Sequence, residues 1–231
     1  IFQNMEILVQ QPSDAERVAK ILAFWDTNMD RVHFHPFPTN DVWIRDYGPT
    51  FLVRDDNAND GLGTLALVDW RFDGWGGKGA SYYGSHDGLD NQIPKRIAQT
   101  LDIHCFEAKL VLEGGAIDTD GRGTLLTTRA CLRNPNRNPL LTEAELSERL
   151  RATLGVERIW WLDHGELEGD DTDAHVDTLA RFVNADTLAY VGCDDRQDPH
   201  YADLAEMARE LEALTAGHGL KLARLPMATP Q

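Results

Sequence analysis

The feature that most constrains this chain is a regular alternation of strand-like and helix-like segments, which recurs four times along its 231 residues. Apolar runs predict a first strand at residues 5–10, 64–72, 123–128 and 187–193. Helical patterns follow at 13–25, 91–101, 142–154 and 198–214, and returning strands at 31–37, 103–108, 158–162 and 220–226. A strand, a helix and a returning strand form a parallel pair with a crossover helix, so an α/β repeat architecture is expected.

The expected helix starts depend on capping residues. Ser13 with Glu16, and Thr142 with Glu145, match the capping-box pattern, in which the first side chain accepts a hydrogen bond from the backbone N–H three residues on. Asp198, followed by a proline, is expected to begin the fourth helix. Sequence identity between the four passes is weak, so the repeat is inferred from the order and spacing of the elements.

Acidic loops follow the returning strand in each of the first three passes. They read TNDVWIRDYGPT, KLVLEGGAIDT and DHGELEGDDTDAHVDT. In repeat architectures equivalent loops gather on one face or around one axis. We therefore expect Asp46, Glu113 and the pair His175 and Asp177 to meet in space, although more than sixty residues separate each loop position from the next.

Each of these residues also has a structural explanation. Asp46 could pair with Arg45 or cap the turn before Gly48, and taken alone it favours that explanation. Glu113 ends an apolar run, where burying a carboxylate is costly unless a partner is present, and this favours a function. A lone histidine such as His175 is more often a satisfied structural residue, but here it lies inside an acidic cluster that would orient it for proton transfer.

The charge balance favours a cationic or neutral ligand. The chain has 22 Lys and Arg against 38 Asp and Glu, a formal net charge of −16, which argues against nucleic acid or an anionic membrane surface as a partner. An acidic surface that only keeps the protein soluble is the simpler explanation. No apolar run approaches the roughly 20 residues that span a bilayer. Three scattered cysteines, Cys105, Cys131 and Cys193, favour reduced thiols, so a cytoplasmic location is expected.

Two chemistries can use such residues. Asp171, Asp173, His175 and Asp177 alternate like ligands on one strand edge, which is compatible with a metal-dependent hydrolase, although no established metal motif supports it. The alternative is recognition of a planar guanidinium, whose N–H fork matches two carboxylates while a histidine and a further acid handle protons. Trp43 is either a core residue or a stacking face for such a cation.

Five segments then resemble a known family. They are WIRDYGPTF, WGGKG, LEGGAIDTDGRGTLLTT, CLRNPNRNP and DDTDAHVDTLARF, and they resemble the agmatine deiminase and bacterial (Porphyromonas-type) peptidylarginine deiminase family of guanidino-modifying enzymes, the penteins. The resemblance runs through nearly the whole chain. It implies an α/β fold, the pentein α/β-propeller of five repeated ββαβ units with the active site on its axis, here incomplete.

The resemblance also implies roles for individual residues. Asp46 and Asp177 match the carboxylates that grip the guanidinium nitrogens, and Glu113 with His175 matches the acid and base pair. Apart from the resemblance, Trp43 is assigned to substrate binding as a stacking face, and Asp171, or alternatively Asp173, to the approach taken by the far end of the substrate. In the family mechanism a cysteine thiolate attacks the guanidinium carbon, ammonia leaves, and water hydrolyses the thiouronium intermediate to a urea product, with no metal and no cofactor.

The attacking thiol is the part of the family pattern that this chain does not show. The family's nucleophile lies in a glycine-rich segment resembling GGGNIHC, which is absent here. Cys131 falls in a part of the pattern that does not carry the nucleophile, and Cys105 and Cys193 match buried strand positions. We therefore expect residues 1–231 to be a single pentein domain that lacks N-terminal and C-terminal parts, including the last blade, and to be inactive alone.

The leading hypothesis is hydrolysis of agmatine to N-carbamoylputrescine and ammonia, a step of putrescine and polyamine biosynthesis. Peptidylarginine deimination is the alternative within the class. A metal-dependent hydrolase and a non-catalytic guanidinium-binding protein are the alternatives from other classes. The expected partner is a small guanidinium compound, with no nucleic acid and no membrane, and a homo-oligomer is left open.

Overall fold

The computed structural model describes residues 3–54, 64–78 and 88–227, and the structural statements below concern these ranges. The strands are β1 (Met5–Leu8), β2 (Val32–His35), β3 (Thr50–Val53), β4 (Leu65–Arg71), β5 (His104–Val111), β6 (Ile117–Thr119), β7 (Thr124–Thr128), β8 (Arg158–Leu162), β9 (Ala180–Asn184), β10 (Thr187–Gly192) and β11 (Lys221–Pro226). The helices are α1 (Pro12–Phe24), α2 (Ile44–Tyr47), α3 (Gly74–Gly77), α5 (Ile93–Leu101), α6 (Arg129–Leu132), α7 (Glu143–Leu154) and α8 (Tyr201–Thr215), with short 3-10 helices η1 (Met29–Arg31), η2 (Asp90–Gln92), η3 (Gly114–Ala116) and η4 (Val176–Thr178).

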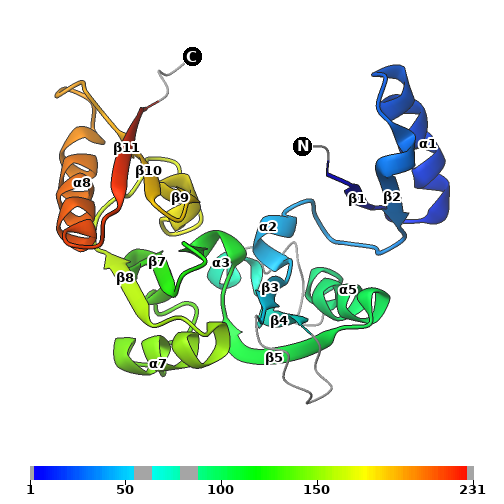
Figure 1. Cartoon of the computed structure of the whole chain (residues 1–231), viewed down its shortest axis with the longest axis horizontal. Helices are drawn as coiled ribbons and strands as arrows, with labels where there is room; N and C mark the ends of the chain where they lie inside the picture. Colours follow the sequence, from blue (N-terminus) through cyan, green and yellow to red (C-terminus); the bar gives the residue numbers. More distant parts are fainter. Residues whose placement is uncertain (1–2, 55–63, 79–87, 228–231) are drawn as a thin grey trace.

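The strands in these ranges form four small sheets with one recurring topology. In the orders β3-β4-β5, β6-β7-β8 and β9-β10-β11, the first strand is antiparallel to the second, and the second is parallel to the third. The parallel strands are joined by α5, α7 and α8 respectively, and the parallel pair β1-β2 is joined by α1. Figure 1 shows the four units following one another along an open arc. The expected ββαβ repeat of an incomplete α/β-propeller is thereby confirmed.

Two apolar clusters hold neighbouring units together. One joins the third and fourth units, and its fully buried members include Leu126, Leu162, Val176, Leu188 and Met207. The other joins the second and third units, and it includes Val68, Leu112, Leu125, Leu146 and Leu150. Side chains on successive positions of β7 therefore serve both cores, because neighbouring residues of a strand point to opposite faces. Each such buried side chain stabilises the fold by about 1.5–3 kcal/mol.

The register of the parallel pair β7–β8 determines which apolar residues of the two strands lie side by side. Leu125 lies opposite Ile159 and Leu126 opposite Trp160 in the parallel pair with β8. All five residues of β7 are buried, as is usual for a strand covered on both faces. After β8 the chain leaves the sheet and enters the loop that precedes η4 and contains His175.

Helix α1 and helix α8 begin differently from the expectation. Ser13 does not cap α1: the helix starts at Pro12 with Gln11 as an N-cap that makes no side-chain hydrogen bond. Proline is favoured in the first turn because its missing N–H would be unpaired there, and this places Ser13 inside the helix. Helix α8 starts at Tyr201, since Asp198 accepts a hydrogen bond from the backbone N–H of His200 in the preceding turn. The capping box of Thr142 and Glu145 is confirmed.

No helix within the described ranges is both long and apolar enough to cross a lipid bilayer.

Candidate active site

Three loops meet at one place, and each follows the last strand of a unit. Asp46 lies in α2 beyond β2, Glu113 is the N-cap residue of η3 beyond β5, and His175 is the N-cap residue of η4 beyond β8. The short helix α2 contacts η3, and η3 contacts η4. The structure therefore brings together side chains from three separate units.

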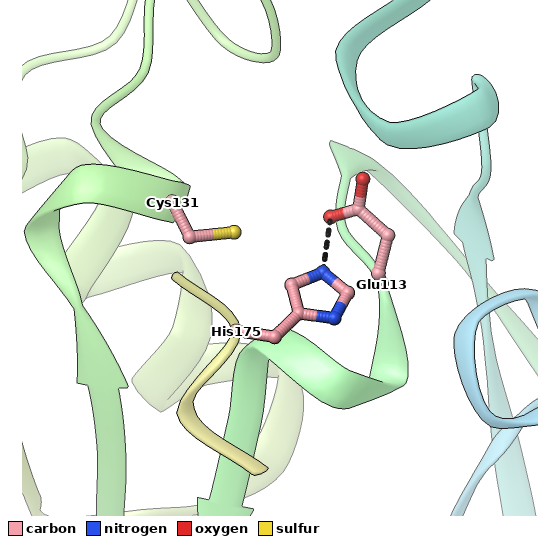
Figure 2. Close-up of side chains that lie close together, drawn as sticks. All are labelled: Glu113, Cys131 and His175. Carbon is pink, nitrogen blue, oxygen red and sulfur yellow. Dashed lines mark ion pairs between the residues drawn. The ribbon is translucent and has the colours of Figure 1, made fainter. Parts of the chain in front are cut away.

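The His175 ring lies between two carboxylates. Its Nε2 is 3.9 Å from Glu113 Oε2 (Figure 2), and its Nδ1 is 3.7 Å from Asp46 Oδ1. Both distances exceed a hydrogen bond, so the couplings are electrostatic. In the part of the chain that the structure describes, Nε2 is buried and has no hydrogen-bond partner. A buried ring nitrogen without a structural partner is available for proton transfer.

The backbone of Gly115 lies in close contact with three side chains of the site. A Cβ atom at this residue would lie 2.5 Å from His175 Nδ1, 2.8 Å from Asp46 Oδ1 and 3.0 Å from Asp177 Oδ2. Only glycine lets the backbone approach three functional side chains this closely. The same geometry shows that the side chains of Asp46, His175 and Asp177 lie together against the Gly115 backbone.

We expect Gly115→Ala to lower kcat/KM by about 10²-fold or more, because the added methyl group must displace His175 or a carboxylate by roughly an ångström. The measurement is guanidine hydrolysis by the complete gene product, normalised to folded protein. Gly121→Ala is the control for the clash: nothing lies within 4 Å of a Cβ atom there, so alanine at its φ of 67° adds backbone strain without touching the site. Wild-type activity in Gly115→Ala would contradict this arrangement of the site.

Asp46 is buried and held by partners that differ from those considered from the sequence. Its Oδ2 accepts a hydrogen bond from Trp75 Nε1 at 2.9 Å, and its Oδ1 accepts one from the backbone N–H of Gly115 at 3.2 Å. These bonds come from α3 and η3, so the carboxylate is aimed inward instead of capping its own turn. Trp75 is the first residue of the WGGKG motif, and its hydrogen bond to Asp46 gives that tryptophan a structural role in the site.

Among the described residues, the cation nearest to the Asp177 carboxylate forms only a long ion pair with it. Arg181 Nη1 lies 4.0 Å from its Oδ2, at the limit of an ion pair. Burial raises the pKa of Asp177, and the nearby charge of Asp46 raises it further, while His175, Arg181 and Arg45 oppose the shift. The charge of Asp46 beside this carboxylate makes the pair suited to binding a cation.

Glu113 has a strong partner that sequence reasoning missed. The side chains of Glu113 and Arg137 are both fully buried, and Arg137 Nε donates to Oε1 at 3.0 Å and to Oε2 at 2.9 Å. Burial alone would raise the pKa of Glu113, but His175 and Arg137 together hold it below its ordinary value. Glu113 is therefore an anion facing His175. Arg137 lies in the polar CLRNPNRNP motif, and nothing in that local sequence distinguishes it from the neighbouring Arg133 as the partner of Glu113.

The acidic segment before His175 is not a strand edge, and the alternation predicted for Asp171 and Asp173 is wrong. Asp173 and Ala174 have left-handed backbone angles, with φ of 66° and 61°. Asp173 binds Lys78 Nζ at 2.5 Å and Arg137 Nη1 at 2.6 Å. Asp171 is exposed, and its carbonyl oxygen accepts from Lys78 Nζ at 2.8 Å. The like charges of this segment are thus partly neutralised by two cations.

One group of potential metal donors lies together within the described ranges. Glu113, Cys131 and His175 offer donor atoms within 4.8 Å of one another (Figure 2). Burial, and then the charge of Glu113, raise the pKa of the Cys131 thiol well above its ordinary value. Arg137 also occupies both oxygens of Glu113. The donor set therefore disfavours a metal ion, and the same burial makes Cys131 a poor nucleophile.

Trp43 lies at the rim of the site. It is 52% exposed, and its ring packs edge to face against Trp75 with centroids 6.3 Å apart. The exposed face remains available for stacking on a cation.

Comparison with known proteins gives a consistent result. Residues 1–231 match the family model described as Porphyromonas-type peptidyl-arginine deiminase. An agmatine deiminase of Medicago truncatula is 36% identical over 203 residues, which cover 87% of this chain and 54% of that protein.

Two solved structures are also similar. A substrate-bound agmatine deiminase of C. jejuni, carrying a cysteine-to-serine substitution, superposes with a TM-score of 0.84 at 34% identity, over 100% of this chain and 62% of that one. The agmatine deiminase of Enterococcus faecalis gives a TM-score of 0.84 at 28% identity, over 99% of this chain and 60% of that one. The chain thus spans about half the length of the M. truncatula relative and under two thirds of these two structures.

Proposed function

This chain belongs to the Porphyromonas-type peptidyl-arginine deiminase family, and on that premise we propose that the complete protein hydrolyses the guanidinium C–N bond of agmatine. The products would be N-carbamoylputrescine and ammonia. The observation that carries the proposal is the convergence of Asp46, Asp177 and His175 on one point beside Gly115. Two anions and a proton donor around one small volume match a planar cation that must lose a nitrogen.

The two carboxylates would bind and polarise the guanidinium. A delocalised guanidinium is a poor electrophile, because its charge is spread over three nitrogens. Asp46 and Asp177, each close to Gly115, would accept hydrogen bonds from different nitrogens and concentrate positive charge at the carbon. Glu113 does not serve this purpose, because its charge is already paired with the buried Arg137 guanidinium. Asp46, by contrast, accepts hydrogen bonds among the described residues only from neutral N–H groups, those of Trp75 and Gly115.

His175 would move the protons. In the first step a thiolate forms a bond to the guanidinium carbon, the C–N bond breaks, and His175 protonates the departing nitrogen, which leaves as ammonia. In the second step His175 takes one proton from water, the hydroxide oxygen bonds to the carbon, and the C–S bond breaks to release the thiolate. The remaining hydroxyl proton passes to the released ammonia as the urea carbonyl forms. Ionised Glu113 would stabilise the ring while it carries the proton.

The thiol would come from outside residues 1–231, which we propose form one pentein domain of the complete protein. Cys131, whose thiol lies near His175, is fully buried with a raised pKa. Cys105 is a strand residue whose pKa is also raised, first by burial. The substrate-bound C. jejuni relative carries a cysteine-to-serine substitution, which supports a thiol nucleophile in that protein.

Peptidylarginine is the second candidate substrate, favoured by the family description. Agmatine is preferred because the named agmatine deiminases match this chain over most of its length. We further propose a role in putrescine and polyamine biosynthesis and a cytoplasmic location, which the three free cysteines support.

The test is incubation of the complete gene product with agmatine in the presence of EDTA, followed by mass spectrometry. The expected product is the ureido compound, in which an oxygen replaces an NH group. If arginyl peptides react and agmatine does not, the peptidylarginine alternative holds. Loss of all activity with EDTA would favour the metal hydrolase, and no turnover of agmatine, arginine or arginyl peptides would favour a binding protein.

A further inference from the structure

A single buried arginine connects the two halves of the proposed acid and base pair. Arg137 follows α6, and its side chain is fully buried. Nε donates to both oxygens of Glu113 at 3.0 and 2.9 Å. On the other side of the same guanidinium, Nη1 donates to Asp173 Oδ2 at 2.6 Å and Nη2 to the carbonyl oxygen of Thr172 at 2.9 Å. The two groups reached by Nη1 and Nη2 lie two and three residues before His175.

The segment before His175 is held in a conformation that needs such support. Asp173 and Ala174 are non-glycine residues with φ of 66° and 61°, which costs free energy unless the surroundings impose it. Asp170 accepts hydrogen bonds from Thr172 N at 2.8 Å and Ala174 N at 2.6 Å, and Thr128 Oγ1 donates to Ala174 O at 2.7 Å. The end of this segment is the N-cap position of η4, which carries His175.

We propose that Arg137 is a positioning residue, whose one rigid guanidinium fixes Glu113 and the His175 segment relative to each other. The proposal rests on the proposed function, in which Glu113 and His175 form the acid and base pair. The planar fork matters, because three N–H groups at fixed angles define both the distance and the orientation of the groups they bind. Without it, the 3.9 Å gap between His175 Nε2 and Glu113 Oε2 would not be maintained.

Arg137 also sets the charge of Glu113. The charged and titratable groups that face Glu113 are Arg137, His175 of the η4 loop, Cys131 of α6 and Asp73 before α3. Arg137 is the permanently charged cation in this set, and His175 is charged only when protonated. Removal of Arg137 would therefore leave a buried carboxylate whose ionised form depends on His175 alone.

The experiment compares Arg137→Gln and Arg137→Lys in the complete gene product. Arg137→Gln should lower kcat about 10²-fold, with KM for agmatine little changed, and should move the acid limb of the kcat profile to higher pH. Arg137→Lys retains the charge and loses the fork, so kcat should fall while the acid limb stays close to that of the wild type. Arg122→Gln, at the exposed ion pair with Asp186, is the matched control and should change neither quantity.

Removing one partner of a buried ion pair is strongly destabilising, so Arg137→Gln can fail to fold. Asp173→Asn then tests the same connection on the side of the His175 segment, because Asp173 accepts a hydrogen bond from Arg137 Nη1. Arg137 keeps its contact with Glu113 in this variant, so kcat should fall about tenfold or more with the acid limb unmoved. If folded Arg137→Lys and Asp173→Asn both retain wild-type kcat, the positioning role is wrong.

A titration of the Glu113 side chain requires no substrate turnover, so it tests the role of Arg137 separately from the proposed function. Glutamate labelled with ¹³C at the carboxyl carbon, with the Glu113 signal assigned through Glu113→Gln, reports the titration of that side chain directly. Arg137→Gln should raise its pKa relative to the wild type. If Arg137→Gln lowers kcat while both the acid limb and this titration stay unchanged, Arg137 is only structural. If the wild type turns over no guanidine compound, the proposed function fails and the titration still tests the placement.

Discussion

Replacement of His175 by alanine is expected to lower kcat for agmatine by about 10³-fold, within the range that general acid and base catalysis contributes. The reason is the position of the ring, with Nδ1 3.7 Å from Asp46 and the unpartnered Nε2 3.9 Å from Glu113. No other histidine contacts both carboxylates in the described ranges. KM should change less, because Asp46 and Asp177 remain to bind the cation. Steady-state kinetics of the complete gene product measure both constants.

His164→Gln is the matched control for this variant. His164 also pairs with a glutamate, since its Nδ1 lies 2.6 Å from Glu210 Oε1, but the pair belongs to the contact between α8 and the loop after β8. Its loss should leave kcat unchanged. Guanidine hydrolysis that survives His175→Ala at the wild-type rate would remove the catalytic role of this residue, whatever the fate of the binding site.

The sequence predicts the repeat and the meeting of the loops because both depend on regular patterns. Strand and helix periods place the crossover helices, and the topology then puts the loops with Asp46, Glu113 and His175 at one edge. Thr142 with Glu145 is predictable for the same reason, since a capping box is a local motif. Ser13 with Glu16 matches the same capping-box motif but does not form it, because Pro12 already occupies the first turn of α1.

The partners of the site residues could not be predicted from local pattern. Arg137 binds Glu113 across 24 residues and Thr172 across 35, so its role appears only when the chain is folded. The contact of Trp75 with Asp46 is non-local in the same way. Asp171 and Asp173 alternate in sequence as strand residues would, but hydrogen bonds to Asp170 and two left-handed residues turn the backbone instead. Side-chain competition for the backbone outweighs periodicity in such a short segment.

Asp177→Asn is expected to have opposite effects on activity and on stability. Activity should fall, because one of two carboxylates that pair with the guanidinium loses its charge, and truncating one partner of a buried charge pair costs about 2–5 kcal/mol of binding. Stability of the ligand-free protein should rise at neutral pH. Burial and Asp46 raise the folded-state pKa of Asp177, so the ionised side chain is less favourable in the folded protein than in the unfolded chain.

The pH dependence follows from the sign of that shift. A carboxyl group with a raised folded-state pKa contributes stability that is present below its ordinary pKa and is lost as the pH rises through the folded-state value. The difference in Tm between Asp177→Asn and the wild type should therefore be positive at pH 7 and should disappear in acid, where both side chains are neutral. Asp186→Asn, at a side chain that is 73% exposed, should show no difference at either pH.

Agmatine provides the complementary measurement, because a bound cation relieves the repulsion between Asp46 and Asp177. It should raise the Tm of the wild type and have little effect on Asp177→Asn. A variant that is destabilised at pH 7 and still stabilised by agmatine would show that Asp177 is a structural carboxylate. The guanidinium would then have to be held by Asp46 with a group outside the described ranges. The closeness of the Asp46 and Asp177 carboxylates, which both lie against Gly115, would need another explanation.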